Sequence, residues 1–150
     1  MPILEYSNTV YTLNNKNIEK IEKVQKKITK FLCFKTNIIN VNYIERLKYL
    51  KLLPLSVRRD VKILKIINRI ILNLNIHDNW SNSFEFKSNR NGNTIIIKKS
   101  RINLCDRNLF SYASKLYNSL PINQRLSDNF LIDIKEAQLF LHNKFIQNYL

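Results

Sequence analysis

The chain has 150 residues, 45 % of them hydrophobic, and carries 25 Lys or Arg against 11 Asp or Glu, a formal net charge of +14. This apolar fraction supports one domain with a packed core and excludes a disordered chain. The apolar runs are too short to cross a bilayer, and the first residues lack the basic start of a signal peptide. Two separate cysteines, Cys33 and Cys105, exclude a disulfide scaffold and favour a reducing intracellular compartment, cytoplasm or nucleus.

The excess of positive charge indicates partners rather than fold. Nucleic acid is the commonest polyanion that binds such a surface, and an anionic membrane is the second. A basic surface that only meets water is a third interpretation, and AT-rich codons would explain part of the lysine content. We expect a nucleic-acid partner and no membrane partner.

Residues 2–13 hold apolar side chains without helical spacing and predict an irregular N-terminal segment. Residues 16–32 then predict the clearest helix of the chain. Its apolar residues recur at steps of three and four, so they form one stripe that we expect to face the core: Ile18, Ile21, Val24, Ile28, Phe31 and Leu32. The opposite face carries six lysines against Glu19 and Glu22, and these lysines are Lys16, Lys20, Lys23, Lys26, Lys27 and Lys30.

Two further helices follow. Asn42 is expected to cap a helix over residues 43–53, which Pro54 ends because the residue before proline avoids helical geometry. Ser56 is expected to cap the next helix, residues 57–74, whose apolar face is broad enough for a buried central helix. The rest of that helix surface is basic and includes Arg58, Arg59 and Lys62.

A polar stretch, residues 73–93, separates these helices from the rest of the chain and predicts a long loop. The Asn91-Gly92 pair signals a turn, and residues 94–97 after it predict a strand. Phe84 and Phe86 alternate as a partner strand would, so a small hairpin is expected here.

The last third of the chain predicts two more helices. The first covers residues 107–120, with Asp106 as its cap and Pro121 at its end. Ser127 or Asp128 is expected to open the last one.

This order of elements predicts a mostly α fold, a helical bundle-like domain with four to six helices and at most one small β-hairpin. Residues 1–75 form a first helical unit, residues 76–104 a polar loop with the hairpin, and residues 105–150 a helical unit that packs on the first within one domain. The predicted core of the main unit is Ile21, Val24, Ile28, Leu47, Leu50, Val61, Leu64 and Ile67.

Catalytic chemistry has no recognisable site in the sequence. The carboxylates are scattered, whereas two-metal phosphoryl transfer needs them clustered around the ions. We therefore expect no metal or other cofactor in this chain. The basic helix faces are better candidates, because a phosphate contact needs only a positive charge within reach, although a solvated lysine face gives almost the same pattern. The candidate nucleic-acid-binding residues are Lys16, Lys20, Lys23, Lys26, Lys27, Lys30, Arg58, Arg59 and Lys62.

Five segments, in the same order along nearly the whole chain, resemble the region that follows the catalytic palm in reverse transcriptases of non-LTR (LINE-type) retrotransposons. The segments are LEY (4–6), IEKIEKVQK (18–26), YIERLKYLKLLPLSVRRD (43–60), NGNTIIIKKSR (91–101) and FSYASKLYNSLP (110–121). Tyr11 and Tyr117 stand where that family usually has tryptophan.

The resemblance implies an RNA-directed DNA polymerase whose post-palm helices form a thumb that grips template and primer. Residues 1–75 would be the thumb-like unit, with RNA or an RNA–DNA hybrid bound irrespective of sequence, and the rest of a polymerase as a further partner. The family's catalytic carboxylates lie upstream of Met1, and Mg²⁺ would belong to that missing palm, so the resemblance implies a fragment that is inactive alone. The alternative is a helical protein–protein interaction module whose basic charge is incidental.

Overall fold

A computed structural model of the chain describes residues 15–38, 40–72, 84–89, 92–97, 108–121 and 132–147. The described residues form five helices and one two-stranded antiparallel sheet, so the predicted mostly α fold with a small hairpin is confirmed. The predicted N-terminal segment and most of the predicted loop 73–93 lie outside the described residues. The expected helix caps Asp106, Ser127 and Asp128 are wrong, because Asn108 caps the helix Leu109–Ser119 and Asp133 caps the helix Ile134–Gln147.

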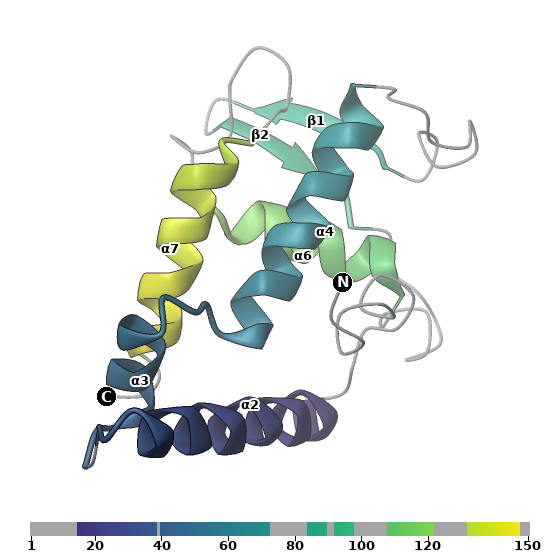
Figure 1. The fold of residues 1–150 in the computed structure, drawn as a ribbon. Coiled ribbons are helices and arrows are strands. Elements are labelled where there is room, and N and C mark those ends of the chain that lie inside the picture. The colour runs from purple at the N-terminus through teal and green to yellow at the C-terminus, as the bar shows by residue number, and fades with distance from the viewer. Residues whose placement is uncertain are drawn as a thin grey trace.

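Helix α2 (Asn15–Lys35) lies across one end of the molecule (Figure 1). It ends where Asn37 takes a left-handed φ of 57° and the Ile38 N–H donates to Cys33 O at 2.9 Å. Asparagine tolerates this conformation better than most residues, and the bond back to the last turn satisfies a carbonyl that the helix leaves free.

Helix α3 (Tyr43–Tyr49) begins as predicted. The Asn42 side chain accepts from the Glu45 N–H and the Glu45 carboxylate accepts from the Asn42 N–H, each at 2.9 Å. This reciprocal pair satisfies two amides that a helix start leaves free. The helix ends four residues before the predicted Leu53, because Lys51 takes a left-handed φ of 52° and a backbone bond from Leu52 to Leu47 closes the turn.

Helix α4 (Leu55–Ile71) begins immediately after Pro54, and the expected cap at Ser56 is wrong. Ser56 is the second residue of the helix, and no side chain of the N-cap residue bonds the first turn. The first amide of the helix, the Leu55 N–H, donates instead to Oε1 of Gln25 on α2 at 2.9 Å. The side chain of Gln25, thirty positions upstream, therefore accepts the hydrogen bond that a local N-cap side chain would otherwise accept.

The main core forms around α4, which packs beside α7 (Ile134–Gln147) while α6 (Leu109–Ser119) crosses behind it (Figure 1). Leu64 and Ile67 on α4 are fully buried, as predicted, and so is Tyr117 on α6. The predicted core positions Leu47 and Val61 are also buried. Ala137 and Leu141 close the core from α7.

The hairpin consists of β1 (Phe86–Asn89) and β2 (Gly92–Ile95), paired so that Phe86 lies opposite Ile95. The second strand begins two residues earlier than predicted. The Asn118 side chain on α6 bonds both backbone groups of Ile95, accepting from its N–H at 2.9 Å and donating to its carbonyl at 2.8 Å. This contact fixes the hairpin to α6.

Helix α7 is attached to α4 by a similar contact. Asn68 on α4 donates to Ile132 O at 2.9 Å and accepts from Ile132 N–H at 3.0 Å, just before α7 begins. Asp133 then caps α7, accepting from the amides of Lys135 and Glu136.

Candidate nucleic-acid interface

The inward face of α2 is polar, which corrects the predicted orientation of this helix. Its buried residues fall at steps of three, four and four: Glu22, Gln25, Thr29 and Cys33, which are 2–6 % exposed except for Thr29 at 0 %. The predicted apolar stripe faces outward instead, with Val24, Ile28, Phe31 and Leu32 at 41 %, 51 %, 58 % and 39 % exposure. Val24 and Ile28 are thus not core residues, and Ile21 is only half-buried.

Two polar contacts explain this orientation. The side-chain amide of Gln25 spans the Pro54 turn, donating to Leu53 O at 3.0 Å and accepting from Leu55 N–H at 2.9 Å. The Tyr43 hydroxyl donates to the buried carboxylate of Glu22. Buried polar groups without partners cost free energy. A helix that gives both of these side chains a hydrogen-bond partner on its inner face turns its apolar stripe outward.

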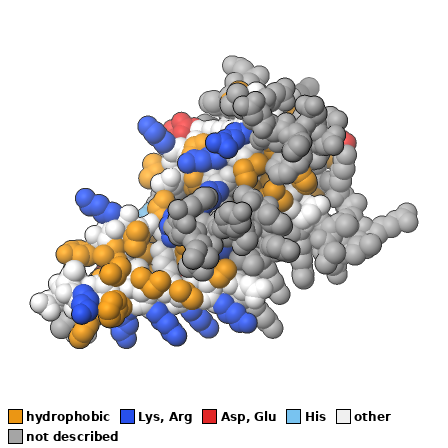
Figure 2. Space-filling model, turned by 45° about the vertical axis from the view of Figure 1, so that its right-hand side comes forward, with side chains coloured by type: hydrophobic (Ala, Val, Ile, Leu, Met, Phe, Trp, Pro, Cys, Tyr) orange, Lys and Arg blue, Asp and Glu red, His pale blue; other side chains and the backbone are white. Residues whose placement is uncertain are grey.

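The lysines form a row on the outer side of α2, next to the apolar stripe. Lys20, Lys23, Lys27 and Lys30 are all exposed, as predicted for a helix face at steps of three and four. Figure 2 shows Lys and Arg side chains along the lower edge of the molecule, directly below a band of apolar side chains. We call these four residues the lysine row.

Two other predicted lysines of α2 have different positions. Lys26 is half-buried, with its Nζ 5.1 Å from the centre of the Tyr43 ring, a cation–π arrangement. Lys16 lies in the first turn of α2, and its side chain is outside what the structure describes.

The lysine row has little acidic charge beside it. Glu22 points inward to Tyr43, which leaves Glu19 as the exposed carboxylate among the described side chains of α2. Because Glu22 is removed from the surface, the outer side of the helix is more positive than the sequence alone indicates.

The three candidate binding residues on α4, Arg58, Arg59 and Lys62, do not extend the lysine row. Arg59 is 5 % exposed, so its guanidinium cannot meet a phosphate in this conformation. Arg58 and Lys62 are half-buried. Helix α4 leaves α2 at a steep angle (Figure 1), so its basic residues do not run alongside the row.

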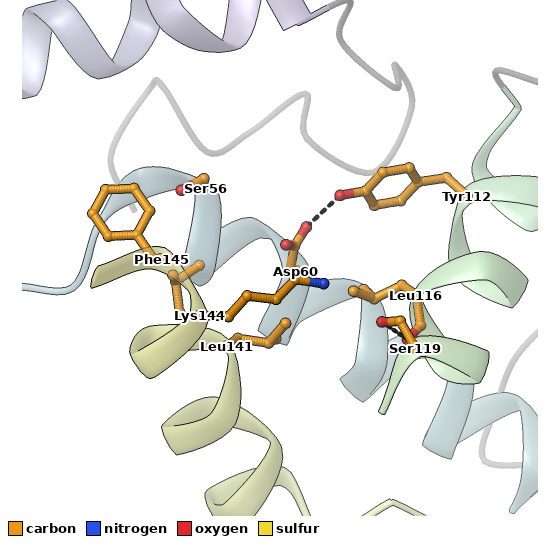
Figure 3. Close-up of a pocket in the computed structure, with 9 residues that line it drawn as sticks. Ser56, Asp60, Tyr112, Leu116, Ser119, Leu141, Lys144 and Phe145 are labelled. Carbon is orange, nitrogen blue, oxygen red and sulfur yellow. Dashed lines mark hydrogen bonds between the residues drawn. The ribbon is translucent and has the colours of Figure 1, made fainter. Parts of the chain in front are cut away.

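A separate cavity of about 270 Å³ lies between α4, α6 and α7 (Figure 3). The Tyr112 hydroxyl donates to Oδ1 of Asp60 there at 2.7 Å. Burial raises the pKa of Asp60 to about 6, although Tyr112, Arg59 and Lys144 lower it. Burial also raises the pKa of Tyr112, as does Asp60 beside it. Sequence reasoning missed this pair, because nothing local marks an acid in a basic helix as the partner of a tyrosine fifty-two residues away.

The described part of the chain offers little for other chemistry. No three His, Cys, Asp or Glu side chains come together there in a way that could hold a metal ion. None of the described helices combines the length and the apolar character needed to span a membrane. The exposed lysine row is therefore the best candidate for a functional surface.

Comparisons with known proteins identify no relative of the chain. No protein-family model, no curated protein and no solved structure matches the chain.

Proposed function

We propose that this chain binds nucleic acid through the lysine row, as a thumb-like region of an RNA-directed DNA polymerase of the non-LTR retrotransposon type. The observation that carries the proposal is the row itself, four exposed lysines on one side of a single helix with the nearest buried carboxylate turned inward. The resemblance of five sequence segments to that family supports the choice of polymerase.

The geometry of the row suits a sugar–phosphate backbone. Lys20 and Lys30 are ten residues apart, which corresponds to roughly 15 Å along a helix. A duplex carries about one negative charge per 1.7 Å of its axis, so the row can meet several phosphates at once. Such contacts read no base edges, and binding to RNA or to an RNA–DNA hybrid is expected to be indifferent to sequence.

The proposal assigns no catalysis to this chain. Carboxylates and Mg²⁺ for nucleotide transfer would be supplied by a palm elsewhere in the polymerase. The purified chain is therefore expected to extend no primer, which a primer-extension assay with Mg²⁺ or Mn²⁺ checks. The protein would act in the cytoplasm or nucleus, where such templates occur.

A charge-neutralised variant tests the binding proposal. Replacing Lys23, Lys27 and Lys30 with Gln should lower the affinity for an RNA–DNA hybrid and reduce the slope of log K against log salt by about two to three units. The matched control is Lys65→Gln, Lys115→Gln and Lys135→Gln, which makes the same charge change at exposed positions on α4, α6 and α7. If both variants lose affinity equally, only net charge matters and the row has no special role.

A second candidate function rests on the exposed apolar stripe of α2. Val24, Ile28 and Phe31 would cover a partner surface in a helical interaction module. Apolar association is weakened little by salt, whereas phosphate binding weakens steeply. A partner complex that survives high salt and is lost on Ile28→Asp would favour this second function.

A further inference from the structure

A second cavity lies at the C-terminal end of the lysine row. It has a volume of about 320 Å³, which is near the lower limit for small-ligand pockets, and it lies between the last turns of α2 and the start of α3. Its lining is mixed: Cys33 is 2 % exposed and Ile38 and Val41 are half-buried, and the polar side chains of Lys30, Asn40 and Arg46 also line it. We call it the α2–α3 pocket.

The loop between the helices shapes this pocket. Asn37 and Asn40 both take left-handed backbone angles, with φ of 57° and 62°. Each such residue reverses the local direction of the chain, and asparagine adopts the conformation at lower cost than most residues. Val41, after this loop, and Cys33, before it, both line the pocket.

The rim of the pocket carries an aromatic ring and two cations. Phe34 lines it and is 69 % exposed, the highest exposure among the large apolar side chains of the described residues. Lys30, the last member of the lysine row, also lines it. A large exposed aromatic next to a positive charge is the arrangement with which single-stranded nucleic acid is commonly bound, the base on the ring and the phosphate on the cation.

Arg46 is the second cation, and two contacts hold it in place. Its Nη1 donates to Val41 O at 2.6 Å, and its Cζ lies 5.9 Å from the centre of the Tyr43 ring. A guanidinium has five N–H donors. The bond to Val41 uses one of them and the Nε–H is buried, which leaves three donors on the two Nη atoms. A fixed guanidinium with donors to spare suits a phosphate or a base carbonyl, since little rotamer entropy is lost on binding.

We propose that the α2–α3 pocket receives one unpaired nucleobase at the end of a duplex held on the lysine row, with its phosphate between Lys30 and Arg46. This inference rests on the proposed function, because the row supplies the paired part of the ligand. Phosphates follow the row to Lys30, and the strand that continues past the duplex then reaches Phe34. The preferred ligand is accordingly a hybrid or duplex with a single-stranded extension.

The test compares one RNA–DNA hybrid as a blunt duplex and with a short extension at either end. Fluorescence anisotropy should show the full chain binding at least one extended form about fivefold or more tighter than the blunt form, the range expected for one base stacked on an aromatic ring. Phe34→Ala should remove this preference while leaving the affinity and salt slope for the blunt duplex unchanged.

Phe31→Ala is the matched control. Phe31 is 58 % exposed on the same helix and does not line the pocket, so its removal should leave the preference intact. In a direct readout, 2-aminopurine at the first unpaired position should change its fluorescence on binding the unaltered chain and Phe31→Ala but not Phe34→Ala. Both variants replace exposed side chains and are expected to fold, which circular dichroism checks.

The outcomes separate this inference from the proposed function. Equal affinity for blunt and extended hybrids contradicts base binding in the α2–α3 pocket and leaves the proposed nucleic-acid binding by the lysine row unaffected. An equal loss of preference in Phe31→Ala and Phe34→Ala also overturns it, because the effect then belongs to the whole helix face. Absence of binding to every form overturns the proposed function as well.

Discussion

The hydroxyl of Tyr43 on α3 donates to the buried carboxylate of Glu22 on α2, twenty-one residues earlier in the chain. Glu22 is 4 % exposed and its other oxygen has no hydrogen-bond partner in the described structure. The ammonium of Lys26 also lies over the Tyr43 ring, with Nζ 5.1 Å from the ring centre. One side chain thus orients both a buried acid and a neighbouring base on α2.

Removing the Tyr43 hydroxyl should therefore loosen α2. Tyr43→Phe leaves a buried carboxylate without its donor, which should lower the free energy of unfolding by about 1–3 kcal/mol. Urea denaturation measures this change. Tyr49→Phe on the same helix is the control, because Tyr49 is 59 % exposed and should lose almost nothing. If Glu22→Gln combined with Tyr43→Phe costs as much as the two single changes added together, the two residues are not coupled.

A second prediction compares a core position on α4 with the outward stripe of α2. Leu64→Ala on α4 should lower the free energy of unfolding by about 2–5 kcal/mol, because Leu64 is 0 % exposed and its truncation leaves a cavity. Ile28→Ala should stay within about 0.5 kcal/mol of the unaltered chain, as is usual for surface positions. Thermal and urea unfolding of the two variants check this. A large loss for Ile28→Ala would mean that the stripe on α2 is covered.

The Asp60–Tyr112 pair predicts a dependence of stability on pH. The pKa of Asp60 rises from 3.8 to about 6 on folding, so the native state keeps a proton that the unfolded chain releases. Its contribution to stability is fully present below pH 3.8 and is lost as the pH rises through about 6. The full effect is at most about 3 kcal/mol.

Asp60→Asn tests this contribution. The amide oxygen can still accept from Tyr112 and carries no charge, so stability should fall less between pH 4 and pH 7 than in the unaltered chain. Asp133→Asn makes the same charge change at an exposed cap and keeps a capping oxygen, so the pH dependence should persist. Urea titrations at several pH values measure both. A slope in Asp60→Asn that matches the unaltered chain would assign the dependence to other groups.

The hairpin is predicted to depend on Asn118. Asn118→Ala removes both bonds to Ile95 and leaves a buried strand end without partners, which should cost about 1–3 kcal/mol for each unpaired group. Hydrogen exchange at the Ile95 amide should rise sharply. Asn143→Ala, at an exposed position on α7, is the control and should change neither quantity.

In this protein the sequence predicts where helices form better than it predicts which face of each helix is buried. Val61, Leu64 and Ile67 are buried as expected, since the apolar face of α4 is broad and continuous, and Leu47 on α3 is buried as well. Helix α2 has a polar and an apolar stripe at similar spacing, and periodicity identifies both without saying which one meets the core. The hydrogen bonds of Gln25 to Leu53 and Leu55 explain why the polar stripe faces inward, and these partners lie about thirty residues away in the chain.

The same reason limits what could be predicted about the candidate site. The lysine row is a local pattern on one helix, so the sequence located it. Arg59 was also a candidate, but it is 5 % exposed, and the burial of a side chain depends on tertiary packing that a local pattern does not report. The α2–α3 pocket depends on two left-handed asparagines and on Arg46 bonding Val41, and none of these leaves a periodic signal.

The outward apolar stripe of α2 has a consequence for handling the protein in solution. Each copy carries +14, and at low ionic strength this charge keeps copies apart. At about 1 M salt the Debye length falls to about 3 Å, and Val24, Ile28 and Phe31 of one copy can then meet those of another. The salt that strips nucleic acid from the lysines is thus also the salt that promotes clustering, so sedimentation of the free protein at each salt step belongs with every binding titration.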